Sequence, residues 1–214
     1  MNKKYIKLIM LFISIFVLSG CVNVKQDSIE KIVNYISSTK HNVQNTVNRG
    51  YKYYLPRNLN ISYQDNLNTI IKSKYYDYYL YVDLISYFNN EKITYKKDDS
   101  LYYSSYFKDK NGMINVTKLS DSYLIHIEYN YAKIEVKVEE NDIKDGIANA
   151  LIIITSIEYN RDVINAMLDE GILSLNERPV EIFNVKTVDQ GDFLDIDESQ
   201  YEDDENKIDT DYIN

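Results

Sequence analysis

The chain has 214 residues, enough for one domain of ordinary size with terminal extensions, and its 44% of hydrophobic residues predicts an ordered core. The net charge of −9 is unevenly distributed. Residues 189–214 hold eleven acids and one base, residues 1–20 hold three lysines, and residues 21–188 hold 20 bases and 22 acids. No basic stripe is visible, which argues against nucleic acid as a partner.

Residues 1–20 have the layout of a secretory signal peptide. Three lysines precede an apolar run over residues 8–18, which matches a signal sequence and is too short to span a bilayer stably. The run ends in Leu18-Ser19-Gly20-Cys21, where small residues leave a peptidase access to the bond before the cysteine. This segment resembles the lipobox of bacterial lipoproteins.

The lipobox resemblance implies a defined processing of this chain. A diacylglyceryl group, with acyl chains of the palmitate type, joins the thiol of Cys21, and cleavage follows between Gly20 and Cys21. Two acyl chains hold a protein stably on a membrane. The expected location is the extracytoplasmic face of a cell membrane, and the Lys/Asn/Ile-rich composition favours a Gram-positive type of bacterium. Cys21 is the sole cysteine, so an intrachain disulfide is impossible.

The charge pattern and the motifs divide the mature chain into three parts. Residues 21–27 form a short lipidated tether. Residues 28–188 form a single domain, and residues 189–214 form an acidic tail whose like charges predict disorder.

The domain is expected to begin with a helix over residues 28–38. Ile29, Ile32, Val33 and Ile36 recur at helical spacing, and Asp27 is the predicted N-cap. A helix so close to the lipid has two expected locations, on the membrane or against the domain. Packing on the domain is the more usual outcome.

Alternating hydrophobic patterns then predict a series of strands. Residues 75–88 alternate, with Asp77 and Asp83 on one face, and Asn111-Gly112 predicts a hairpin turn. These spacings favour an antiparallel meander with one buried face. The predicted strands cover residues 51–56, 68–72, 75–88, 101–107, 113–119, 123–129 and 132–138.

After residue 139 the pattern returns to a helical period. Helices are predicted over residues 143–157, with Asn141 as cap, and over residues 160–170, with Gly171 as the stop. Gly146 is expected to let the first of these approach the sheet closely. A short strand is expected near residues 180–185. The fold class is therefore α+β, an antiparallel sheet covered by N-terminal and C-terminal helices.

The order of these elements is similar to that of PsbP-like domains. The similarity covers roughly residues 50–160 and rests on a Tyr-rich first strand ending in Leu55-Pro56, a meander, and a long helix running into residues 155–159. It implies an α/β/α sandwich and a role in binding or assembly. No functional residue is carried over, because no family motif is matched.

The sequence offers little catalytic chemistry. Its six glycines are widely separated, which argues against phosphate-binding loops and the nucleophile elbow. His41 and His126 are the only histidines. His126 shares a strand face with Glu128, so a His–carboxylate pair is conceivable, but the ring is expected to point to solvent. Asp77 and Asp83, six residues apart on one strand, would lie about 20 Å apart, too far for a glycosidase pair.

The acidic tail contains an incomplete calcium-loop pattern. Asp195, Asp197 and Ser199 match the first ligands of an EF-hand, but Gln200 stands where glycine is required and Asn206 where glutamate is expected. We therefore expect no metal and no cofactor.

The sequence as a whole predicts a membrane-anchored binding or assembly module of the cell envelope, not an enzyme, with an unidentified envelope protein or ligand as its partner. Two alternatives stay open. One is an envelope hydrolase whose site is built from scattered residues, and the other is a carrier of a small apolar ligand.

Overall fold

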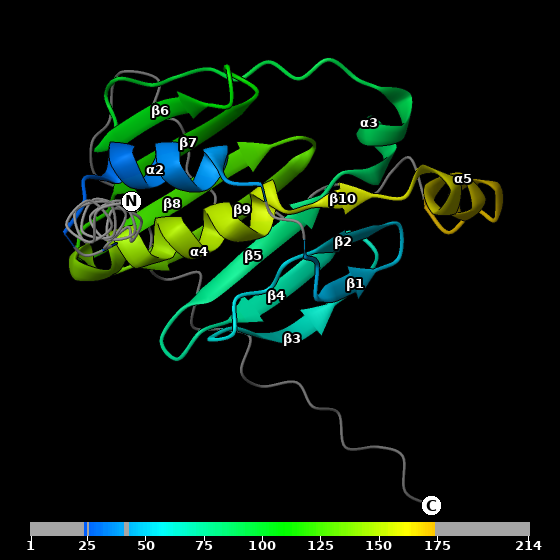
Figure 1. Ribbon diagram of the computed structural model, residues 1–214, viewed down its shortest axis with the longest axis horizontal. Coiled ribbons are helices and arrows are strands. Elements are labelled where there is room, and N and C mark those ends of the chain that lie inside the picture. The colour runs from blue at the N-terminus through cyan, green and yellow to red at the C-terminus, as the bar shows by residue number, and fades with distance from the viewer. Residues whose placement is uncertain (1–23, 25, 41–42, 174–214) are drawn as a thin grey trace, which may run out of the picture. The chain divides into compact units, whose positions relative to one another are not determined.

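A computed structural model describes residues 24, 26–40 and 43–173, and Figure 1 shows them in colour. They form an α+β domain, as expected. The helical segments are α2 (Ile29–Ser38), α3 (Leu84–Asn89), the 3₁₀ turn η1 (Glu140–Asp142), α4 (Ile143–Thr155) and α5 (Arg161–Asp169). The strands are β1 (Thr46–Asn48), β2 (Tyr51–Tyr53), β3 (Asn60–Gln64), β4 (Asn68–Lys72), β5 (Asp77–Val82), β6 (Tyr103–Phe107), β7 (Gly112–Lys118), β8 (Tyr123–Tyr129), β9 (Ala132–Val138) and β10 (Glu158–Tyr159).

The described strands form two antiparallel sheets. The large sheet has seven strands in the order β3-β4-β5-β9-β8-β7-β6, and the small sheet has the order β1-β2-β10. Within the large sheet, β3–β5 and β6–β9 are each a run of neighbouring antiparallel strands. The pairing of β5 with β9 joins the two runs, so the expected meander is two meanders side by side.

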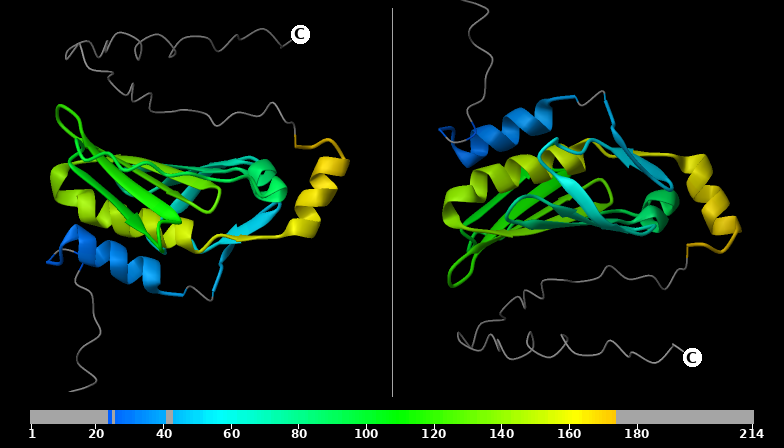
Figure 2. Two further views of the ribbon diagram at one scale, coloured as in Figure 1. Left: turned by 90° about the horizontal axis from the view of Figure 1, so that it is seen from above. Right: turned by 90° about the horizontal axis from the view of Figure 1, so that it is seen from below.

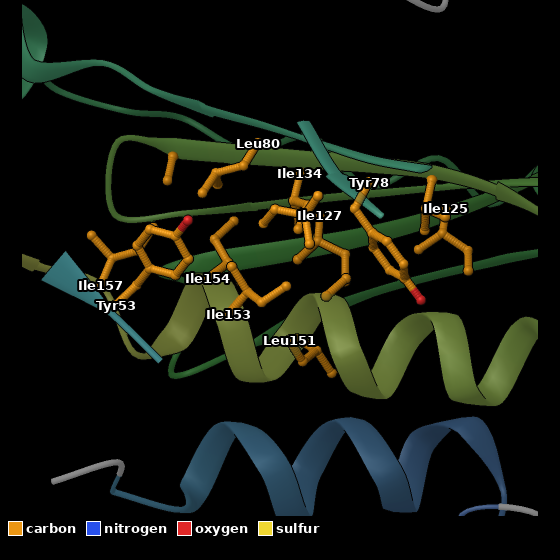
Figure 3. Close-up of a cluster of buried hydrophobic side chains, with 14 of the residues drawn as sticks. Tyr53, Tyr78, Leu80, Ile125, Ile127, Ile134, Leu151, Ile153, Ile154 and Ile157 are labelled. Carbon is orange, nitrogen blue, oxygen red and sulfur yellow. The ribbon is translucent and has the colours of Figure 1, made fainter. Parts of the chain in front are cut away.

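The core lies between the large sheet and α4, and α2 packs against α4 on that same side (Figures 2 and 3). Ile125, Ile127 and Ile134 of the sheet are fully buried there. A Cβ on Gly146 of α4 would lie 2.8 Å from Cδ1 of Ile125, which confirms that this glycine permits a close approach to the sheet.

The opposite side of the large sheet carries no helix of the described residues (Figure 2). The helices α2 and α4 therefore form a helical layer on one face only. The α/β/α sandwich implied by the PsbP-like resemblance is not confirmed by this arrangement.

The strand predicted over residues 75–88 is too long. It ends at Val82, because Asp83 caps the short helix α3 by accepting a hydrogen bond from the backbone N of Ser86 at 2.9 Å. Asp77 and Asp83 therefore do not share a strand face. The hydrogen bond from a free backbone N–H to an Asp side chain stabilises the start of a helix. Here this stabilisation exceeds the preference of the alternating apolar residues for a longer strand.

Two predicted helix starts also need correction. Ser28, not Asp27, is the N-cap of α2, and it accepts a hydrogen bond from the backbone N of Lys31 at 3.3 Å. Asp27 instead forms an ion pair with the Lys31 ammonium. Asn141 does not cap α4, because it lies inside η1. The helix α5 begins at Arg161, one residue after the predicted start, and Asn160 is its N-cap.

The β6–β7 hairpin is present, but its turn differs from the expected Asn-Gly geometry. Lys108, Asp109 and Lys110 take the positive φ angles. Gly112 instead opens β7, where an added Cβ would lie 2.4 Å from the ring of Phe107. The strand expected near residues 180–185 lies outside the described residues.

Candidate functional site

The helix-free side of the large sheet, called here the open face, carries most of the polar side chains that the strands bring together. Strand alternation sends every second residue to this side. One register row runs across five strands from β5 to β6, and we call it the polar row. Its members, in spatial order, are Tyr79, Glu135, His126, Asn115 and Ser104.

His126 lies at the centre of the polar row and contacts two carboxylates. Its Nδ1 is 2.9 Å from Oε1 of Glu135, which lies opposite it on β9. Its Nε2 is 2.9 Å from Oε1 of Glu128, two residues along the same strand. The His126–Glu128 pair that the sequence left open is thus present, and a second carboxylate, Glu135, extends it.

The three side chains differ in their exposure. The His126 side chain is 24% exposed and that of Glu128 is 32% exposed, whereas that of Glu135 is only 7% exposed. The ring lies on the open face, but it is mostly covered and is held by two carboxylates, so the expectation that it points to solvent is wrong. The buried carboxylate of Glu135 also lies 3.5 Å from Nζ of Lys133, so it has two cationic partners.

The pKa values of this cluster follow from burial and charge. Burial alone would lower the pKa of His126, but hydrogen bonds to Glu128 and Glu135, with the charges of both carboxylates, raise it to about 9. Burial would raise the pKa of Glu135, but the hydrogen bond from His126 and the charge of Lys133 lower it on balance. At neutral pH the cluster therefore consists of a protonated ring and ionised Glu135.

A protonated His126 has limited chemical roles. Both ring nitrogens carry protons, and both N–H groups point at carboxylates. A ring in this state has no lone pair with which to act as a general base. Its charge balances the carboxylates and fixes their positions across two strands.

The geometry of the cluster also argues against a metal centre. Glu135 and Glu128 approach opposite nitrogens of the ring, so the two carboxylates and one ring nitrogen do not converge on a single point. Within residues 24–173 as described, no group of three His, Cys, Asp or Glu side chains is arranged to hold a metal ion.

The remaining polar row continues toward the sheet edge at β6. Ser104 Oγ donates a hydrogen bond to Oδ1 of Asn115 at 2.6 Å, and it accepts one from the backbone N of Asp98 at 3.2 Å. Nearby, the Tyr106 hydroxyl accepts a hydrogen bond from the backbone N of Lys97 at 2.9 Å. The segment before β6 therefore binds to this end of the open face.

Several residues singled out from the sequence lie outside the described residues. They include Gly20 and Cys21, His41, and the calcium-like positions Asp195, Asp197 and Ser199 in the acidic tail. The described part of the chain contains no helix long and apolar enough to cross a membrane.

The sequence contained a signal from which the contact between His126 and Glu135 could have been predicted. The predicted strands 123–129 and 132–138 leave only Asn130 and Tyr131 between them, and both have positive φ, as in tight two-residue hairpins. Such a connection pairs Tyr129 with Ala132 and therefore His126 with Glu135.

Comparisons with known proteins do not assign the chain to a family. No protein-family model matches it, and no curated protein matches its sequence.

Proposed function

We propose that this protein is a lipid-anchored binding module of the bacterial cell envelope, attached through Cys21, which binds another envelope protein through the open face of its large sheet. The anchor is supported by the signal-like residues 1–20 and by Leu18-Ser19-Gly20-Cys21. The proposed location is the extracytoplasmic face of a Gram-positive type of membrane. A PsbP-like relationship of the domain would suit this role and is part of the proposal.

The observation that carries the binding role is the polar row. It places an aromatic ring, a charged His–carboxylate cluster, an amide and a hydroxyl in register across five strands. The cross-strand contacts of His126 and Ser104 hold these groups in place before any partner arrives. Preorganised polar groups lower the entropy lost on binding, and tyrosine is enriched in protein interfaces.

The two alternative functions receive less support from the described residues. A hydrolase that used His126 as its base would need an unprotonated ring, whereas His126 is protonated at neutral pH and engaged at both nitrogens. A carrier would need an apolar cavity, whereas the space between α4 and the sheet is occupied by the side chains of Figure 3, including Tyr78, Ile127 and Ile154.

The anchor is tested by replacing the acylated thiol. Cells expressing Cys21→Ser should show no incorporation of labelled palmitate into the protein and should accumulate the uncleaved precursor. The unaltered chain, expressed at the same level, is the control. Incorporation of label into the Cys21→Ser protein would overturn the proposed anchor.

The binding face is tested by capture from detergent-solubilised envelope membranes. Lys137 is exposed on the open face, and Lys40 is exposed near the end of α2 on the other side of the sheet. We expect Lys137→Glu to lose the captured protein and Lys40→Glu, the same charge change, to retain it. The comparison is repeated without residues 189–214. Equal capture by both variants, or no capture by any form, would contradict the proposal.

A further inference from the structure

The segment from α2 to β1 carries three of the eight large hydrophobic side chains that are exposed among the described residues, and it follows the proposed anchor directly in sequence. Tyr35 on α2 is 47% exposed, Val43 is 66% exposed, and Val47 on β1 is 76% exposed. Figure 2 shows α2 and the start of β1 on the side of the molecule away from the open face. We call Lys31, Tyr35, Val43 and Val47 the α2–β1 surface.

The proposed tether limits how far this surface can move from the bilayer. Cys21 and Ser28, the N-cap of α2, are separated by seven residue steps, which span at most about 25 Å when fully extended. The helix α2 itself adds about 15 Å. A chain held at Cys21 therefore keeps the start of α2 within about 25 Å of the lipid and its end within about 40 Å.

Two orientations satisfy this tether, and the charges distinguish them. In an end-on orientation, the end where α2 and α4 begin would face the membrane (Figure 1). Glu139 and Glu140 are exposed at that end, with Asp142 beside them, and all three would approach anionic headgroups. Repulsion between like charges disfavours that approach.

The α2–β1 surface is better suited to a lipid surface. Lys31 and Lys40 offset Asp27 and Glu30, and Tyr35 has the polar tip and apolar ring that favour the membrane–water boundary. Each contact is weak by itself. The lipid anchor raises the effective concentration of the surface at the bilayer, so weak contacts suffice to bias the orientation.

From these observations, we propose that the α2–β1 surface rests on the headgroups of the membrane and that the open face points away from it. This inference rests on the proposed anchor at Cys21. It gives the open face access to a partner in the envelope, and it assigns the exposed apolar side chains of the α2–β1 surface to a lipid surface.

The test uses the full lipidated chain in vesicles of phosphatidylglycerol and phosphatidylcholine. Acylation consumes the thiol of Cys21, so a single introduced cysteine takes an environment-sensitive fluorophore. The labelled positions are Tyr35→Cys and Val47→Cys on the α2–β1 surface, with Lys137→Cys on the open face as the matched control. Lipids with a quenching group on the acyl chain near the headgroup report proximity to the bilayer.

We expect loss of fluorescence at positions 35 and 47 and none at position 137. Replacing Tyr35 and Val47 together by serine should reduce the quenching of a probe at Val43→Cys. Equal quenching at all positions, quenching at position 137 alone, or no quenching in protein that floats with the vesicles would overturn the orientation and leave the anchor standing. Protein that does not float with the vesicles would overturn both proposals.

Discussion

His126 and Glu135 face each other across β8 and β9, with Nδ1 of the ring 2.9 Å from Oε1 of the carboxylate. The carboxylate side chain is 7% exposed, and the ring shields part of it. Because Glu128 contacts the other ring nitrogen, protonation of one histidine affects two carboxylates on two strands. The cluster thus couples the charges of two neighbouring strands on the open face.

The first prediction concerns the protonation of His126. A proton NMR titration of the ring should give a pKa of about 9, and the His41→Gln variant assigns the signal. The folded pKa lies above the ordinary value of 6.5, so the cluster stabilises the fold fully below pH 6.5 and less as the pH rises to about 9. The expected loss is about 3 kcal/mol. A ring that titrates near 6.5 would contradict the assigned geometry.

The second prediction compares the two carboxylates. Glu135→Gln should lower the free energy of unfolding by about 1–3 kcal/mol at neutral pH, because it weakens charged hydrogen bonds in a buried position. Glu128→Gln, at the more exposed site, should cost less than about 1 kcal/mol. Urea unfolding measures both. The difference between the two losses should shrink near pH ~10, where the ring is neutral. An equal loss in the two variants at neutral pH would refute the argument that the more buried carboxylate contributes more to stability.

Local patterns were sufficient to predict most of the central strands. The bounds of β8 and β9 coincide with the predicted ranges, because apolar residues alternate cleanly up to a two-residue turn. The short strands β1, β3 and β10 were not predicted. The strand β10 pairs with a distant segment, with Glu158 opposite Lys52 of β2, and β1 and β10 have only three and two residues, too few for a periodic signal. The strand β3 is longer, but its residues do not alternate between buried and exposed, and its pairing with β4 shifts register between Ile61 and Tyr63.

The candidate site was predictable only in part. The proximity of His126 and Glu128 follows from their spacing along one strand. The join of β5 to β9, which brings Tyr79 beside Glu135, depends on pairing between segments more than fifty residues apart in sequence. No local pattern encodes that pairing, and it is what makes the open face one continuous surface.

The third prediction concerns two buried tyrosines of β2. The hydroxyl of Tyr53 is buried and has only the Thr69 side chain near it, with no hydrogen bond of good geometry, whereas that of Tyr51 accepts a hydrogen bond from Nδ2 of Asn48 at 2.7 Å. Tyr53→Phe should therefore raise the free energy of unfolding by about 1 kcal/mol, and Tyr51→Phe should lower it by a similar amount. Thermal and urea unfolding measure the pair, which shares the same chemical change. Destabilisation by both substitutions would show that the Tyr53 hydroxyl has a partner.

The fourth prediction concerns the packing of α4 on the sheet. Alanine is favoured over glycine inside a helix by about 1 kcal/mol. At position 146, however, the new Cβ would lie 2.8 Å from Cδ1 of Ile125 and 3.2 Å from Cγ1 of Val138, and both side chains are buried. Overpacking of this kind costs about 1–3 kcal/mol. We therefore expect that Gly146→Ala does not raise the free energy of unfolding. It should lower this free energy if the cost of overpacking exceeds the gain in helix propensity.

A second substitution separates overpacking from other effects at position 146. Ile125→Val removes the Cδ1 atom that the new methyl group would meet, at a cost of about 1 kcal/mol when made alone. In the double variant, the space left by Cδ1 accommodates the methyl group of the alanine, so the two substitutions should be less harmful together than the sum of their separate effects. A favourable coupling of about 1 kcal/mol, measured by urea unfolding of all four proteins, is the expected result. If the effects of the two substitutions on the free energy of unfolding simply add, contact with Ile125 is not the reason that glycine occupies position 146.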